Sequence, residues 1–178
     1  MGTLLGDAHL GYPTKKSTMP RLSINHGYKQ YEYAAWKASE LSALGTTVKK
    51  VANGGYGEFN ARVDSKCVSA LEEFHLMFYG SGTKRITNAV LDELSGLALA
   101  VLICDDGSVQ EDYSIYTNGF DPVSIENLVR WFWDHGIECT THTNSGTFIR
   151  TYRKGTVQLA AMINQYIPRC MEYKKWQE

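Results

Sequence analysis

Two apolar stretches of the sequence, 3–10 (TLLGDAHL) and 97–109 (LALAVLICDDGSV), each end in an acid beside a small residue, at Asp7 and Asp106. An unpaired carboxylate at the end of a buried segment costs several kcal/mol when it loses its hydration. If the stretches are helices that pack together, their ends bring the two carboxylates close, and like charges so placed need a shared proton or a divalent cation. Oxygen ligands predict Mg²⁺, with Mn²⁺ as a substitute, and such an ion suits phosphodiester hydrolysis.

Residues near these acids are small enough to let two helices approach closely. A single aspartate at a helix end is more simply explained as emerging into solvent, so its recurrence in both halves is what favours a site. The small residues are Gly6, Ala8, Ala98, Ala100 and Gly107.

The chain contains an internal repeat. Residues 22–45 align with 113–136 at a constant offset of 91, which pairs Ser23 with Ser114 and places a glycine at the end of each segment. Each copy has the pattern of a short strand, a turn and an amphipathic helix that ends at glycine. Two strand-like runs and another helical pattern follow in each half. The sequence therefore predicts an α+β fold of two αββαββα halves related by a pseudo-two-fold axis.

This repeat divides the chain into an N-terminal half at 1–79, a connecting segment at 80–96 and a C-terminal half at 97–178. Two halves in one polypeptide predict a protein that functions as a monomer.

Composition restricts the class of protein. The chain has 178 residues, 43% of them hydrophobic, and its four cysteines lack the paired spacing of a zinc site. No apolar run approaches the roughly 20 residues of a membrane span, so we expect a soluble intracellular protein of a bacterial or phage cytoplasm or an organelle matrix. The formal net charge of −1 is unusual for a protein that binds a polyanion. Nucleic-acid binding would therefore depend on how the basic residues are distributed.

Alternation in the strands predicts one polar sheet face in each half. Leu22 and Ile24 should point inward, as should Ile115 in the second half, and the set Phe59, Ala61 and Val63 should do the same. The opposite positions carry side chains that can pair with base edges in a major groove, although a solvated sheet face would have the same pattern. The residues predicted to contact bases are Arg21, Ser23, Asn25, Glu58, Asn60, Arg62, Ser114, Tyr116 and Asn118. Those predicted to meet phosphates are Lys15, Lys16, Lys49, Lys50, Arg150 and Arg153, and His142 and Tyr152 are also predicted to bind DNA.

The two apolar stretches resemble the signature helices of the LAGLIDADG homing endonuclease family, and the ending YIPRCMEYKK resembles the close of its intron-encoded double-motif members. In that family the catalytic acid precedes the final small residue, which selects Asp7 and, in the pair Asp105–Asp106, the second. The resemblance also implies saddle-shaped DNA-binding sheets and metal ligands from the backbone of Gly6 and Asp105. A basic residue beside each acid is implied as well, and by position these residues are Lys84 and Lys174.

The resemblance implies a Mg²⁺-dependent, site-specific DNA endonuclease that cuts both strands of a long asymmetric duplex. One alternative is an intron RNA maturase or an inactive nucleic-acid-binding regulator on the same scaffold. Another is an unrelated α+β protein built from a duplicated interaction domain. Retention of both acids favours the enzyme. The five histidines are scattered without ligand spacing, so they are predicted not to bind metal.

Overall fold

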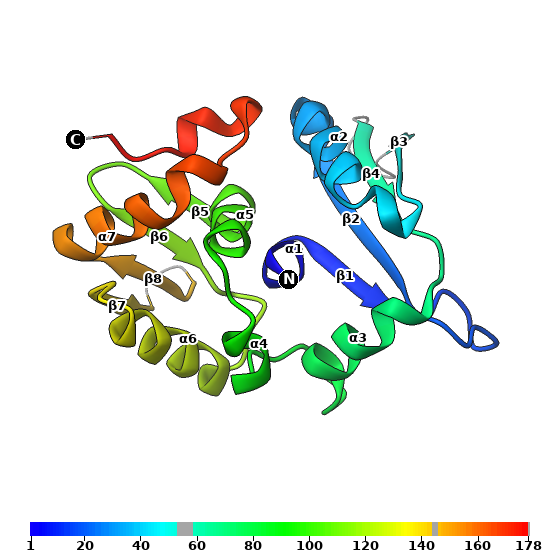
Figure 1. Ribbon diagram of the computed structural model, residues 1–178, viewed down its shortest axis with the longest axis horizontal. Coiled ribbons are helices and arrows are strands. Elements are labelled where there is room, and N and C mark those ends of the chain that lie inside the picture. The colour runs from blue at the N-terminus through cyan, green and yellow to red at the C-terminus, as the bar shows by residue number, and fades with distance from the viewer. Residues whose placement is uncertain (53–58, 144–145, 178) are drawn as a thin grey trace. The chain divides into compact units, whose positions relative to one another are not determined.

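The computed structural model describes residues 1–52, 59–143 and 146–177 and has an α+β fold (Figure 1). The predicted order of helices and strands, αββαββα in each half, is confirmed. The first half contains α1 (Gly2–Leu5), β1 (Ala8–Gly11), β2 (Arg21–Gly27), α2 (Tyr31–Glu40), β3 (Thr47–Ala52), β4 (Phe59–Asp64) and α3 (Glu72–Tyr79). The second contains α5 (Gly96–Asp106), β5 (Gly107–Val109), β6 (Tyr113–Tyr116), α6 (Pro122–Asp134), β7 (Cys139–His142), β8 (Phe148–Thr151) and α7 (Arg153–Ile163), and α4 (Asn88–Asp92) lies between the halves.

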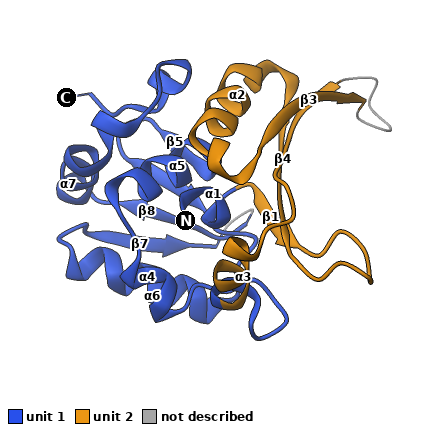
Figure 2. Ribbon diagram, turned by 45° about the vertical axis from the view of Figure 1, so that its right-hand side comes forward, with its two compact units in different colours: residues 1–6, 77–178 blue, residues 7–76 orange. Residues whose placement is uncertain are grey.

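The chain forms two compact units, shown in two colours in Figure 2. One unit is residues 7–76 and the other is residues 1–6 together with 77–178. Helix α1 therefore packs within the unit that holds α5, although it belongs to the first half of the sequence. The predicted halves at 1–79 and 97–178 divide the chain by its sequence repeat, whereas the two units divide it by compact packing. The boundaries of the halves therefore stay a prediction.

The unit of residues 7–76 contains an antiparallel sheet with the strand order β1-β2-β4-β3. Helix α2 packs against it and buries Tyr33 and Ala34. The inward side of the sheet carries Leu22, Ile24 and Val63, all at most 3% exposed, as alternation predicts. Burial of this apolar set fixes the strand register and directs the intervening polar residues to the other face.

One inward position of this sheet was predicted incorrectly. Phe59 is 46% exposed rather than buried. It is the first residue of β4 and pairs with Ala52 of β3, and Lys50 Nζ lies over its ring, 3.9 Å from the centroid. The ring is thus covered by a cation instead of by the core. Glu58, predicted to contact bases, lies outside the described residues.

The other unit contains a second antiparallel sheet, with the strand order β5-β6-β8-β7. Ile115 and Ile149 face each other across β6 and β8 and are buried, as predicted for Ile115. Helix α6 begins at the N-cap Asp121, whose carboxylate accepts a hydrogen bond from the Ser124 amide at 3.1 Å. The chain turns after α6 at Gly136, with a φ of 74°.

Helices α1 and α5 pack together in this unit, and Gly2 lies against the backbone of Ala98. Residues 98–104 of α5 are all buried, as are all four residues of α1. A Cβ atom on Gly2 would lie 2.5 Å from the carbonyl oxygen of Ala98 and 2.8 Å from its Cα. Because no real Cβ approaches backbone atoms so closely, only glycine permits this contact. Among the described helices, none is long and apolar enough to cross a membrane.

Gly2→Ala should lower the free energy of unfolding by about 1–3 kcal/mol, because the new methyl group would force α1 away from the backbone of α5. Urea denaturation would measure the change. Gly119→Ala is the matched control in the same unit, since a Cβ there would meet nothing within 4 Å. Equal stability of the two variants would contradict the close packing.

Candidate active site and nucleic-acid interface

The end of α1 lies against the end of α5 at Gly6 and Asp105. A Cβ on Gly6 would lie 2.5 Å from the Cβ of Asp105 and 2.8 Å from its carboxyl carbon, and it would meet the Oδ2 atom as well. Gly6 thus leaves the space that the Asp105 side chain fills. Asp106, the acid that the sequence rule selects, is the last residue of α5 and is half-buried. Asp105 is therefore the acid whose side chain faces the C-terminal end of α1.

Each of the two predicted lysines contacts the end of one of these helices. Lys84 Nζ donates a hydrogen bond to the carbonyl oxygen of Gly6 at 3.1 Å. Lys174 Nζ donates one to the carbonyl oxygen of Gly107, the C-cap residue of α5. Unsatisfied carbonyls make a helix C-terminus negative, so both ammonium groups lie where that potential favours them. The structure brings each lysine to the helix end that the sequence assigned to it.

Asp7 begins the unit of residues 7–76, directly before β1, and its carboxylate contacts a histidine of the same unit. The Oδ2 atom of Asp7 lies 3.3 Å from Nδ1 of His26 on β2. The side chain of His26 is 1% exposed and that of Asp7 is 35% exposed. Sequence reasoning missed His26 because it treated the histidines as scattered. The period-two pattern of β2 does place His26 inward with Leu22 and Ile24.

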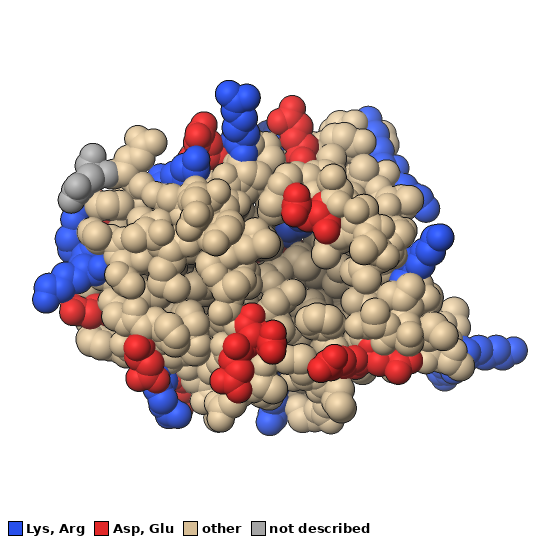
Figure 3. Space-filling view, in the orientation of Figure 1, with Lys and Arg blue, Asp and Glu red and all other residues tan. Residues whose placement is uncertain are grey.

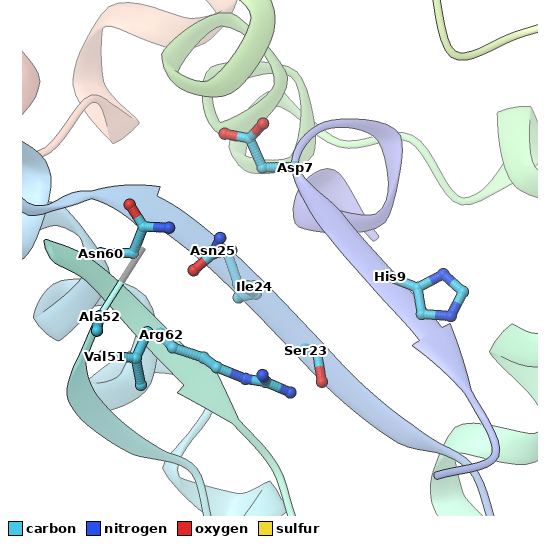
Figure 4. A pocket seen from close by; sticks show the side chains of 9 residues that line it. All are labelled: Asp7, His9, Ser23, Ile24, Asn25, Val51, Ala52, Asn60 and Arg62. Carbon is cyan, nitrogen blue, oxygen red and sulfur yellow. The ribbon is translucent and has the colours of Figure 1, made fainter. Parts of the chain in front are cut away.

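The outward face of this sheet is hollowed beside Asp7 (Figure 4). The depression has a volume of about 400 Å³. Four of its lining residues, on β2 and β4, were predicted to contact bases, and His9 of β1 joins them. The structure thus brings part of the predicted DNA-contact set together on one face, namely Ser23, Asn25, Asn60 and Arg62.

Asp64, which sequence reasoning also missed, connects residues of this face. Its carboxylate accepts a hydrogen bond from Ser23 Oγ at 2.7 Å and pairs with Arg62 Nε at 3.0 Å and with Arg21 Nε at 3.9 Å. Burial opposes ionisation of Asp64, but the hydrogen bonds from Ser23 and Arg62 and the charges of Arg62 and Arg21 outweigh it and lower the pKa. Asp64 therefore holds three predicted DNA-contact side chains in one network.

The outward face of the second sheet carries aromatic rings. Tyr116, Phe148 and His142 stand opposite one another across β6, β8 and β7. The Phe148 ring lies 5.1 Å from that of His142, nearly parallel at 14°, and 5.8 Å from that of Tyr116. Arg150 on the same face pairs with Asp112 at 3.4 Å. Two predicted contact residues, Tyr116 and His142, thus form an aromatic row with Phe148, whereas the network around Asp64 is charged.

Comparison with known proteins agrees with the fold and with the two signature helices. The family model described as "LAGLIDADG DNA endonuclease family" matches residues 1–159. The chain belongs to this family. The predicted resemblance is therefore confirmed.

Solved structures with the same fold include two LAGLIDADG relatives of low sequence identity. The homing endonuclease I-WcaI bound to its DNA recognition sequence has a TM-score of 0.83 and 19% identity, over 99% of this chain and 84% of that one. I-DmoI in complex with DNA and Mn has a TM-score of 0.56 and 17% identity, over 91% and 92%.

Among curated proteins, the LAGLIDADG chain is 34% identical over 109 residues to a protein named RecA from Mycobacterium shimoidei and 34% identical over 110 residues to one from Mycobacterium gastri. Each match covers 61% of this chain and 25% of the relative. The chain thus corresponds to about a quarter of the length of the curated relatives it matches.

The remaining predicted DNA-contact residues lie in varied surroundings. Lys15, Lys16 and Lys49 are exposed, and Asn118 Oδ1 accepts a hydrogen bond from the Thr147 amide at 2.8 Å. Arg153 begins α7 and lies over the Trp176 ring, 4.6 Å from its centroid, while Tyr152 is the exposed N-cap of that helix. On the face shown in Figure 3, acidic and basic side chains are both present and uncharged side chains cover most of the centre.

Asp64→Asn should lower the free energy of unfolding by about 1–2 kcal/mol at pH 7, because it removes the charge that Arg62 and Ser23 bind. The pKa of Asp64 is lower in the folded than in the unfolded protein, so the carboxylate stabilises the fold above about pH 4. This contribution is lost as the pH falls through the folded pKa.

Urea denaturation of wild type and variant at pH 7 and at a pH below the folded pKa of Asp64 would measure the effect, and the difference should disappear at the lower pH. Glu126→Gln, which replaces an exposed acid of α6, is the control and should change little. A difference of the same size at both pH values would contradict the assignment.

Proposed function

We propose that this chain is a site-specific DNA endonuclease that hydrolyses both strands of a duplex with a divalent cation held by Asp7 and an acid at the end of α5. The observation that carries the proposal is the approach of Gly6 to Asp105 where α1 and α5 end. Asp7 is joined to Gly6 by one peptide bond, so its Cα is about 3.8 Å from that of Gly6. Membership of the LAGLIDADG family supports the same activity.

The residues at these helix ends fit a hard cation. They offer carboxylate oxygens, and the absence of a side chain on Gly6 leaves room for one carboxylate to approach the other helix. Mg²⁺ prefers such oxygen ligands, and Mn²⁺ replaces it readily. When bound, the ion would activate water and stabilise the leaving oxygen of the phosphodiester. The carbonyl of Gly6 is a further oxygen at the same place.

Asp105 and Asp106 at the end of α5 are alternatives for binding the cation together with Asp7. Asp106 is the acid selected by the family's sequence rule, whereas the side chain of Asp105 is the one packed against Gly6. We give the metal-binding role to Asp105 for that reason. Asp106, at the last position of the helix, would then support the ion or the DNA from a second position.

Lys84 and Lys174 would act on the phosphate rather than on the metal. Each already has its ammonium group at the carbonyl end of a signature helix, within a hydrogen bond of Gly6 or Gly107. A lysine is a compact point charge, so it can steady a scissile phosphate next to the acid or polarise the attacking water.

The DNA target should be long and asymmetric, because the two sheets offer different chemistry. One sheet presents a charged network around Asp64, and the other presents the aromatic row of Tyr116, Phe148 and His142. Arginine pairs with guanine edges, whereas aromatic rings favour the methyl group of thymine. Two half-sites read by such different side chains would have different sequences, and one chain would suffice to bind both.

Incubation of the protein with a randomised-site plasmid library should give discrete Mg²⁺-dependent ends at one long site, detected by sequencing. Ca²⁺ in place of Mg²⁺ controls for cleavage by a contaminating nuclease that tolerates either ion. Enrichment of bound DNA or of RNA without any cutting would reject the endonuclease in favour of a nucleic-acid-binding regulator or maturase.

Asp7→Asn and Asp105→Asn should each reduce cleavage of that site by about 100-fold or more while DNA binding in Ca²⁺ stays near wild type, because an amide is a poor ligand for Mg²⁺. Asp106→Asn should have a smaller effect. Single-turnover cleavage and a gel-shift assay would measure both quantities. Normal cutting by Asp105→Asn together with loss of cutting by Asp106→Asn would transfer the metal-binding role to Asp106.

A further inference from the structure

We propose that His26 is a positioning residue for Asp7, to whose carboxylate it donates its Nδ1–H hydrogen. This inference rests on the proposed role of Asp7 in holding the cation. It adds a residue that neither the signature helices nor the lysines account for. Nδ1 of His26 and Oδ2 of Asp7 lie 3.3 Å apart within one compact unit.

The imidazole ring has one fixed place in the unit. His26 occupies an inward position of β2, opposite Ala61 of β4, and is 3% exposed. The ring centroid lies 5.1 Å from that of Tyr33, which α2 buries to 1% exposure. A side chain that is already packed between a sheet and a helix loses little additional conformational entropy when it binds and orients a neighbouring side chain. The side chain of Asp7, by contrast, follows the C-cap Gly6 of α1 and is 35% exposed.

The surroundings select one tautomer of His26. Within the part of the chain that the structure describes, Nε2 is buried and has no hydrogen-bond partner. A hydrogen on Nε2 would therefore bury a donor without an acceptor, and it would leave the Nδ1 lone pair facing the carboxylate of Asp7. A hydrogen on Nδ1 avoids both costs. Burial of a bare Nε2 acceptor is the smaller penalty.

The consequence is an Asp7 carboxylate whose orientation is held by a buried donor of the same unit. Partners of this kind orient the groups that bind a metal, and their loss typically weakens metal affinity or activity about 10- to 100-fold. His26 itself stays below the sheet surface, buried beside Tyr33, so it would orient the ligand without touching DNA.

The first test is the tautomer of His26 in the ¹⁵N-labelled protein without metal or DNA. A long-range ¹H–¹⁵N spectrum distinguishes a hydrogen on Nδ1 from one on Nε2, and the His26 signals are assigned by their loss in His26→Asn. The Nδ1–H pattern is the expected result. The Nε2–H pattern would overturn the proposal, whatever the protein does to DNA.

The second test compares substitutions at this position. His26→Leu removes the donor and should raise the Mn²⁺ concentration for half-saturation of the protein–DNA complex, and the Mg²⁺ concentration for half-maximal cleavage, by about tenfold or more. His26→Asn places an amide N–H near the position of Nδ1 and should return both metal concentrations to near the wild-type values. DNA affinity in Ca²⁺ should stay unchanged in both variants.

Val63→Ala is the matched control, because it opens a cavity beside Ile24 on the same sheet without touching Asp7. It should lower the melting temperature and leave the metal dependence at the wild-type value. If His26→Leu behaves like Val63→Ala, the positioning role is overturned and a packing role replaces it. If the wild-type protein cuts no DNA, the proposed function fails, while the tautomer measurement, which uses neither metal nor DNA, still decides whether His26 donates to Asp7.

Discussion

The close packing of α1 against α5 is the contact that positions the candidate site. Gly2 faces the backbone of Ala98, and Gly6 faces the side chain of Asp105, so glycine at both ends of the short helix α1 sets its distance from α5. A helix as short as α1 has little stability of its own. Its helical conformation is therefore stabilised by burial in the unit that holds α5 rather than by intrinsic helix propensity. The acids and lysines at these helix ends depend on that distance.

The two sheets share one topology and differ in what they present. Burial of alternate apolar residues fixes the register of each sheet, and it leaves the remaining positions free to vary. In one sheet the outward positions carry a charged network, in which Asp64 contacts Ser23 and Arg62. In the other sheet they carry the stacked rings of Phe148 and His142. A duplicated scaffold can thus hold two different recognition surfaces without a change in its core.

Several features of the fold and site were predictable from residue patterns alone. The repeat at a spacing of 91 residues predicted the order of helices and strands, and alternation predicted the inward side of β2 and β6. These predictions of the fold succeed because they depend on periodicity and order, which a sequence states directly. The roles of Lys84 and Lys174 beside the two acids stay a prediction.

What the sequence did not predict depends on contacts between strands. Asp64 meets Ser23 only because β2 pairs with β4 in a register that places the two residues opposite each other. The contact of His26 with Asp7 depends in the same way on the pairing of β1 with β2. Phe59 follows the inward alternation but lies at the end of its strand, where Lys50 rather than the core covers the ring. The choice between Asp105 and Asp106 likewise depends on which side chain the helix turns toward Gly6.

The measurement that tests the central proposal most directly is anomalous diffraction from crystals of the protein with its DNA target and Mn²⁺. A Mn²⁺ peak coordinated by carboxylate oxygens of both Asp7 and Asp105, next to a phosphate of the DNA, is the expected result. Mn²⁺ bound by DNA phosphates and other side chains alone, with neither acid among its ligands, would contradict it.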